Sequence, residues 1–151
     1  MPATPPSPPP RAGRLAAPLP LASQILRFGV IGSLGFAVDT ATVYAAHFGL
    51  GLGLYAAGAL GFLVAATFTW AMNRRFTFPE AQSQARGRQW ARFVATQTLG
   101  FLVNRGTYAG LVASVSLARE HPVLAVAAGS VAGMALNFAT ARAIAFRAGR
   151  P

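Results

Sequence analysis

Two neighbouring polar residues, Asn104 and Arg105, lie inside the apolar stretch GFLVNRGTYAG, and one carboxylate, Asp39, lies inside another apolar stretch. A charge at the centre of a membrane-spanning helix costs at least about 2.5 kcal/mol, so such residues pair with one another or serve a function. Asp39 is 12 residues beyond Arg27, and Arg105 is 13 residues beyond Arg92. At 1.5 Å per residue both charges lie about 18–20 Å along two parallel helices, which predicts an Asp39–Arg105 ion pair.

This predicted ion pair has a structural and a functional interpretation. In the structural one, the pair fixes two helices against each other. In the functional one, Asp39, Asn104 and Arg105 form an intramembrane polar centre through which a polar substrate passes. Without a pair, Arg105 would have to extend its side chain outwards to the membrane surface.

A second group of residues, Asn73, Arg74 and Arg75, ends another apolar stretch in the sequence NRRFTFP. The planar guanidinium group of arginine binds two phosphate oxygens at once, so arginines at the depth of the lipid head groups suit a lipid phosphate. The alternative is that these arginines only anchor the helix on one side of the membrane.

Catalysis by this chain is not expected. It has three acidic residues and no cysteine. Glu80 and Glu120 lie on opposite sides of the membrane in the topology inferred below, and the sequence offers no evident nucleophile–base pair or cluster of metal ligands. We therefore expect no enzymatic activity, no cofactor and no metal.

Long apolar stretches must position these polar residues. Only 11% of the 151 residues are charged and 54% are hydrophobic, whereas a soluble domain has about 25% charged residues. About 20 apolar residues span a bilayer as a helix. Four such stretches predict an all-α membrane protein with four transmembrane helices, because a soluble helical core would leave too little polar surface. The predicted helices are at about residues 25–48, 51–73, 91–113 and 122–142.

The arginines predict the orientation of these helices. All 13 basic residues are arginines, and most lie in the N-terminal segment, in the loop 73–92 or near the C-terminus. Such loops stay in the cytoplasm, so both termini are predicted to be cytoplasmic. The net charge of +10 then reflects topology and contact with anionic lipid, and we expect no nucleic-acid partner. The proline-rich residues 1–22 are predicted to be a disordered tail, residues 23–147 a single domain and residues 148–151 a short tail.

The two halves of the chain resemble each other. Residues 27–46 aligned with residues 92–111 give seven identities in twenty positions and place Asp39 on Asn104. Because each half begins and ends on the same side, the halves are predicted to be parallel two-helix repeats, related by an axis along the membrane normal.

Glycines at helical spacing predict where helices approach one another. The predicted helix-packing residues are Gly106, Gly110, Gly129 and Gly133. Four helices bury little surface in a monomer, so we also expect a homo-oligomer.

The stretch NRRFTFP, after a first helix that opens Arg-Phe-Gly and carries an intramembrane aspartate, closely resembles the GtrA-like family of small four-helix bacterial membrane proteins. The resemblance covers residues 25–147. The second half repeats the motif in weakened form, with Asn137, Phe138, Arg142 and Phe146 but alanine at positions 141, 143 and 145. The resemblance implies a role in cell-surface polysaccharide synthesis, in which a sugar on a polyprenyl phosphate is flipped across the cytoplasmic membrane. The residues then expected to bind the lipid phosphate are Asn73, Arg74, Arg75 and Arg142.

Two other functions fit the same residues. A small proton-coupled exporter would use Asp39 to exchange a proton for a cationic substrate. A protein without transport activity would serve as the assembly partner of a membrane glycosyltransferase. The expected partners are therefore a polyprenyl-phosphate-linked sugar, anionic lipid, a membrane glycosyltransferase and further copies of the chain.

Overall fold

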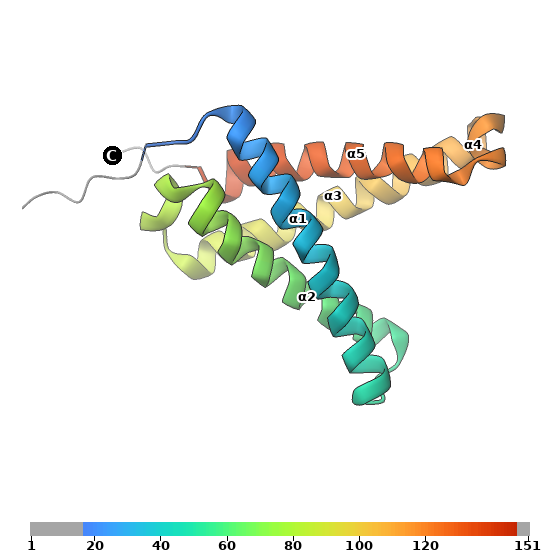
Figure 1. Cartoon of the computed structure of the whole chain (residues 1–151), viewed down its shortest axis with the longest axis horizontal. Helices are drawn as coiled ribbons and strands as arrows, with labels where there is room; N and C mark the ends of the chain where they lie inside the picture. Colours follow the sequence, from blue (N-terminus) through green and yellow to red (C-terminus); the bar gives the residue numbers. More distant parts are fainter. Residues whose placement is uncertain (1–16, 148–151) are drawn as a thin grey trace, which may run out of the picture.

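The computed structural model describes residues 17–147, which form two long helical hairpins (Figure 1). The first hairpin turns at Gly51, whose φ of 70° favours glycine. The second turns after a five-residue helix, and Pro122 then begins the returning helix, where its missing N–H is no loss.

The first hairpin consists of α1 (Leu21–Tyr44), η1 (Ala45–Gly49), α2 (Leu54–Met72) and η2 (Asn73–Thr77). After η3 (Pro79–Ser83), the second consists of α3 (Arg86–Ser114), α4 (Ser116–Glu120), α5 (Pro122–Thr140) and η4 (Ala141–Ala145).

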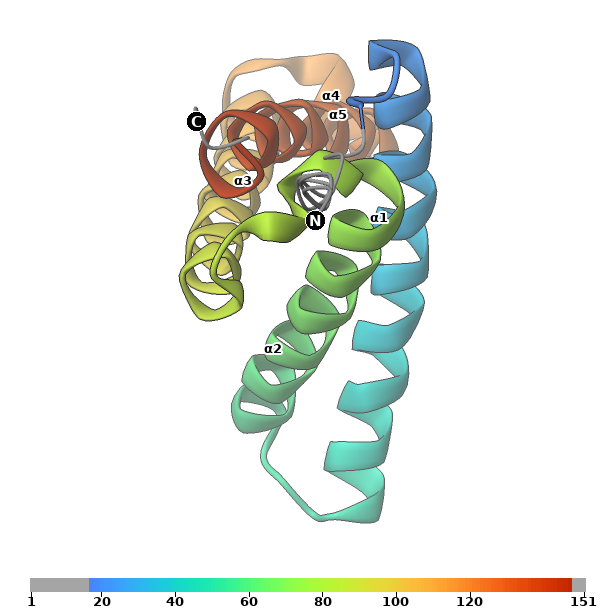
Figure 2. The same cartoon turned by 90° about the vertical axis from the view of Figure 1, so that its left-hand side faces the viewer.

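The two hairpins diverge from a common end, as Figures 1 and 2 show. We call this end the junction; it contains the starts of α1 and α3 together with η2, η3 and η4. Within each hairpin the helices pack along each other, α1 on α2 and α3 on α5. In contrast, no Cα atom of α1 lies within 8 Å of a Cα atom of α3. The molecule is therefore V-shaped rather than a closed four-helix bundle.

The aromatic core of the protein lies at the junction. Phe78 is fully buried, and its ring stacks on that of Phe146 with 4.6 Å between the centroids. Phe93 packs edge-on against Phe146 at 5.5 Å, and Phe28 belongs to the same cluster. These rings come from both hairpins, so the cluster joins the hairpins.

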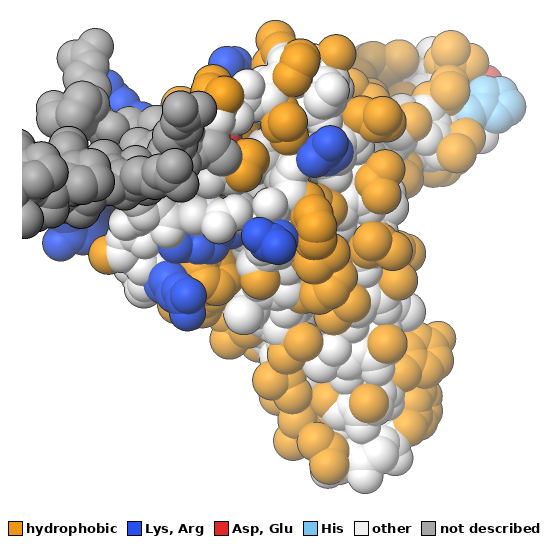
Figure 3. Space-filling view, turned by 60° about the vertical axis from the view of Figure 1, so that its left-hand side comes forward, with side chains coloured by type: hydrophobic (Ala, Val, Ile, Leu, Met, Phe, Trp, Pro, Cys, Tyr) orange, Lys and Arg blue, Asp and Glu red, His pale blue; other side chains and the backbone are white. Residues whose placement is uncertain are grey.

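Beyond the junction the hairpins expose apolar side chains, while arginines gather towards the junction (Figure 3). Three helical segments of the described chain are long and apolar enough to cross a membrane: Leu21–Gly49, Leu54–Thr77 and Pro122–Ala145. The segment α3 is equally long but more polar, since it carries residues such as Arg92, Gln97 and Arg105. A fourth span through α3 remains a prediction.

Two helices begin earlier than the sequence predicted. α1 starts at Leu21, inside the predicted tail 1–22, and α3 starts at Arg86 instead of near residue 91. Residues 1–16 of that tail and the predicted tail 148–151 lie outside the described residues.

Equivalent contacts recur in the two hairpins, as the repeat in the sequence predicted. In each hairpin, two glycines face the same positions of the partner helix. Gly35 faces Thr69 in the first hairpin as Gly100 faces Asn137 in the second. Likewise, Gly61 faces Asp39 as Gly129 faces Asn104. The second long helix of each hairpin also ends in a π-helical turn, η2 or η4. The two hairpins therefore repeat one packing scheme, and their parallel arrangement in a membrane stays a prediction.

The four predicted packing glycines fall into two groups. Gly129 and Gly133 lie against α3, where an added Cβ would come within 2.6 Å and 2.9 Å of main-chain oxygens. At Gly106 and Gly110 an added Cβ would meet nothing within 4 Å in the described chain. Only the first two glycines serve packing within the hairpin.

We expect Gly129→Ala to lower the free energy of unfolding by about 1–3 kcal/mol, because the new methyl group overpacks the α3–α5 contact. Gly106→Ala is the matched control and should leave stability unchanged or raise it by up to about 1 kcal/mol, since alanine favours the helix. Unfolding of the purified protein in detergent micelles measures both. Equal losses in the two variants would contradict the packing described above.

Candidate functional site

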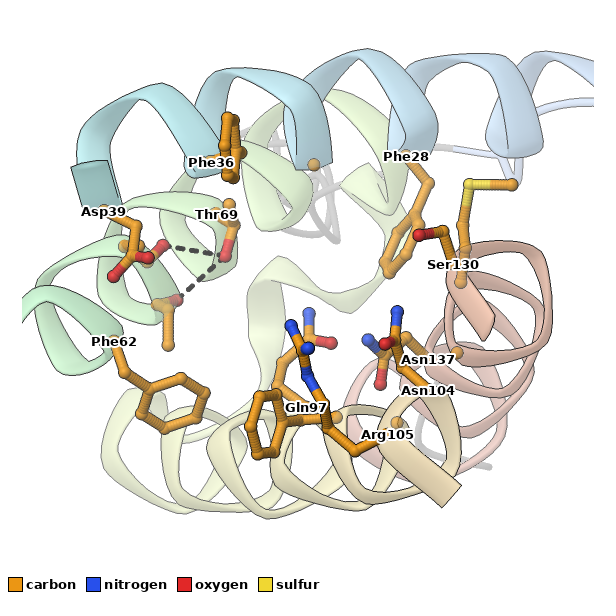
Figure 4. Close-up of a pocket in the computed structure, with 18 residues that line it drawn as sticks. Phe28, Phe36, Asp39, Phe62, Thr69, Gln97, Asn104, Arg105, Ser130 and Asn137 are labelled. Atoms are coloured by element: carbon orange, nitrogen blue, oxygen red, sulfur yellow. Dashed lines mark hydrogen bonds between the residues drawn. The ribbon is translucent and has the colours of Figure 1, made fainter. Parts of the chain in front are cut away.

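A cavity of about 380 Å³ opens where the two hairpins diverge (Figure 4). All four long helices contribute to its lining, with Asp39 from α1, Thr69 from α2, Gln97 and Arg105 from α3, and Asn137 from α5. Phe28 of the aromatic core also lines it, so one end of the cavity adjoins the junction. Its volume is at the lower end of the range of about 300–1,000 Å³ that is usual for small-molecule sites.

The three residues of the predicted polar centre, Asp39, Asn104 and Arg105, all line this cavity. The predicted Asp39–Arg105 ion pair was wrong, however, because no such pair is formed within residues 17–147. Each helix packs on its hairpin partner instead, and no Cα atom of α1 lies within 8 Å of a Cα atom of α3. The Asp39 carboxylate lies beside Gly61 of α2. The Arg105 guanidinium lies over the Phe101 ring, 5.6 Å from its centroid, and points into the cavity.

Two amide side chains add to this polar lining. Gln97 was not singled out from the sequence, and Asn137 was noted only as part of the weakened motif. Their oxygens, Gln97 Oε1 and Asn137 Oδ1, are buried but accept no hydrogen bond within the described chain. The signal that would have identified Gln97 is its alignment with Gly32 of the first repeat. A long amide there is unusual in an apolar segment.

Asn73 lies in the interior of the protein rather than at a surface. Its Nδ2 donates to the main-chain oxygen of Thr69 at 2.9 Å, and its Oδ1 accepts from the Thr77 hydroxyl at 2.8 Å. Both polar groups of the side chain therefore hold the π-helical turn that ends the first hairpin. This contact gives Asn73 a structural role.

Arg74 is also engaged within the protein. Its guanidinium donates to Gln89 Oε1 and to the main-chain oxygens of Gln82 and Gln84, and it lies over the Trp70 ring. Gln89 Oε1 accepts from Trp70 Nε1 as well, at 3.2 Å. We call this group of Trp70, Arg74 and Gln89 the arginine clamp. It ties the end of α2 and the loop after it to the start of α3.

The arginine clamp borders a second hollow of about 300 Å³, which Arg75 and Arg86 also line. Arg75 is exposed and makes no side-chain hydrogen bond to the described residues. Arg86 was not among the predicted phosphate-binding residues, because the loop that brings it near Arg75 could not be inferred. Arg142 lies on η4, outside this hollow. Several guanidinium groups around one hollow suit an anion such as a phosphate.

Apolar helical hairpins, a cationic junction and three segments able to cross a bilayer define an all-α, multi-pass membrane protein. The family model of the GtrA/DPMS transmembrane domain matches residues 27–149, and the chain belongs to this family. Membership associates it with glycosylation or polysaccharide synthesis at a membrane. No curated protein matches the chain.

Proposed function

We propose that this protein translocates a polyprenyl-phosphate-linked sugar across the bacterial cytoplasmic membrane. The observation that best supports this proposal is the cavity between the diverging hairpins, which combines a carboxylate, amides and a guanidinium in an otherwise apolar protein. A sugar head group loses its hydration in the membrane, and these groups replace hydrogen bonds to water. The polyprenyl chain remains in the lipid beside the hairpins.

In the proposed topology α3 is a fourth membrane span, and the junction, with both termini, lies on the cytoplasmic side. The arginines near the junction support this orientation, because positively charged segments stay in the cytoplasm. Arg75 and Arg86 then lie at the depth of the lipid head groups, where they bind the phosphate of the carrier or an anionic lipid. Arg74 supports this site by holding the loop through the arginine clamp.

The proposed role requires no covalent chemistry, so we regard the protein as a transporter and not an enzyme. A membrane glycosyltransferase would supply or consume the lipid-linked sugar. The V shape leaves the cavity open, which favours a homo-oligomer or such a glycosyltransferase as the partner that encloses it. A proton-coupled exporter is the second candidate function, supported by the position of Asp39 in the cavity lining.

Translocation of citronellyl phosphoglucose into proteoliposomes tests the proposal. We expect the double variant Arg75→Lys with Arg86→Lys to reduce the initial rate at least about tenfold, because lysine keeps the charge but loses bidentate contact with phosphate. Arg142→Lys is the control and should keep the rate, since Arg142 lies outside the hollow. Protease accessibility of the termini should be the same in all variants.

No translocation of the probe by the wild-type protein would reject the proposed function. In that case, uptake of a cationic dye driven by an imposed pH gradient and abolished by Asp39→Asn would identify the exporter. Activity of a co-reconstituted glycosyltransferase that depends on the protein, without translocation, would identify the assembly partner. Equal rates in the double variant and Arg142→Lys would remove the phosphate role from Arg75 and Arg86.

A further inference from the structure

The cavity lies between structurally equivalent surfaces of the two repeats. Most residues that line it on one hairpin correspond, in the alignment of the repeats, to a lining residue on the other. When residues 27–46 are aligned with 92–111, the corresponding pairs are Gly32 and Gln97, Gly35 and Gly100, Phe36 and Phe101, and Asp39 and Asn104. When residues 58–78 are aligned with 126–146, they are Phe62 and Ser130, and Thr69 and Asn137. The cavity is therefore placed on the axis that relates the repeats.

The two walls of this cavity differ in chemistry although they correspond in position. We call Gln97, Asn104, Arg105 and Asn137 of the second hairpin the amide wall. On the first hairpin, Gly32 has no side chain where the amide wall has Gln97. Thr69 replaces Asn137, and its hydroxyl already donates to main-chain oxygens of its own helix, at 2.9 Å and 3.2 Å. Apart from Asp39, the first hairpin presents an apolar wall.

The amide wall has hydrogen-bonding capacity that the protein does not use. Gln97 Oε1 and Asn137 Oδ1 are buried acceptors without a donor in the described chain. Buried polar atoms without partners are rare in native proteins and call for a water or a ligand that supplies the hydrogen bond. Asn137 is held close to Gly100, where even a Cβ atom would collide with its amide. The Asn137 amide therefore lies at the border between the α3–α5 contact and the cavity.

We propose that the amide wall recognises the sugar, and that Gln97 and Asn137 are the residues that determine specificity for it. When a sugar binds, the two amide side chains turn towards the cavity, so that their oxygens accept hydrogen bonds from sugar hydroxyls, and the Arg105 guanidinium donates to sugar oxygens. The apolar wall contacts the C–H face of the ring, so the head group binds in one orientation only. The choice of a lipid-linked sugar as the ligand rests on the proposed function. The assignment of ligand recognition to the amide wall rests on the two unpartnered oxygens.

Equilibrium binding to the full chain in lipid nanodiscs tests this assignment without requiring transport. The probes are citronellyl phosphoglucose and citronellyl methyl phosphate, called the sugar probe and the phosphate probe; both are phosphodiesters with one negative charge, and they differ in the sugar. The wild-type protein should bind the sugar probe about tenfold more tightly than the phosphate probe. Gln97→Met and Asn137→Leu should each weaken binding of the sugar probe about fivefold and leave the phosphate probe unchanged, since each removes a hydrogen bond of ordinary strength.

Thr69→Val is the matched control, because Thr69 is the counterpart of Asn137 on the apolar wall. It should leave the affinity for both probes unchanged. Thermal unfolding of each variant identifies any loss of fold, and Gln97→Met, at a partly exposed position, provides the test if Asn137→Leu does not fold.

Equal binding of the two probes by the wild-type protein would overturn the inference. So would unchanged sugar preference in both Gln97→Met and Asn137→Leu, which would mean that water satisfies the two oxygens. If the sugar preference depends on these residues but proteoliposomes do not translocate the probe, recognition by the amide wall stands and the translocation function fails.

Discussion

Replacement of Gln89 by leucine is expected to lower the free energy of unfolding by about 3 kcal/mol. Gln89 is buried, and its amide makes three contacts: Oε1 accepts from Arg74 and Trp70, and Nε2 donates to the main-chain oxygen of Ala81 at 3.1 Å. Leucine would leave a charged donor and two neutral groups without this partner, and each lost partner of a buried polar group costs about 1–3 kcal/mol. Unfolding of the purified protein in detergent, followed by tryptophan fluorescence, measures the loss.

Gln24 provides an internal control for this experiment. It corresponds to Gln89 in the first repeat and is equally buried. Its Nε2 donates to the main-chain oxygen of Leu19 at 3.0 Å, whereas its Oε1 has no partner in the described chain. Gln24→Leu should therefore cost only about 1 kcal/mol, the usual net value of one hydrogen bond. Equal losses at the two positions would show that the arginine clamp contributes nothing beyond burial.

The largest loss of stability is expected for Phe78→Ala, at about 3–5 kcal/mol, because it leaves a cavity between the two hairpins. Phe78 is fully buried and stacks on Phe146, so the variant removes a contact between the repeats rather than one within a hairpin. Phe76→Ala is the control, since Phe76 is 46% exposed. Chemical unfolding of both variants in detergent gives the comparison.

Spin-label distances test whether Phe78 also fixes the angle between the hairpins. The chain contains no cysteine, so labels on Leu60→Cys in α2 and Val126→Cys in α5 are specific. The distance distribution should broaden in Phe78→Ala and stay narrow in Phe76→Ala. A narrow, unshifted distribution in Phe78→Ala would mean that contacts other than the aromatic core hold the V shape.

Local patterns in the sequence predicted much of the architecture. The apolar stretches predicted the long helices, and the likeness of the two halves of the sequence is matched by equivalent contacts at Gly61 and Gly129. The similar depth of Asp39 and Arg105 follows from the helical rise alone, and both residues line the cavity. That they form an intramembrane polar centre stays a prediction.

Contacts that depend on tertiary arrangement could not be predicted. The depth of Asp39 and Arg105 carried no information on the angle between hairpins, so their divergence, and with it the absence of the ion pair, was missed. Likewise, the sequence NRR did not show that Arg74 would be used within the protein, or that the loop would bring Arg86 beside Arg75. These features depend on how α2 meets α3 at the junction.

The equivalent glycine contacts mean that one scheme of helix packing is used twice in a single chain. In a dimer of identical two-helix hairpins, both walls of the central cavity would have the same sequence, so every substitution in the lining would occur twice. Because both hairpins belong to one chain, their lining residues can differ. The contacts of Gly35 and Gly100 are equivalent, whereas position 32 is glycine and position 97 is glutamine. The cleft therefore has two distinct sides, and an asymmetric ligand has a preferred way of entering it.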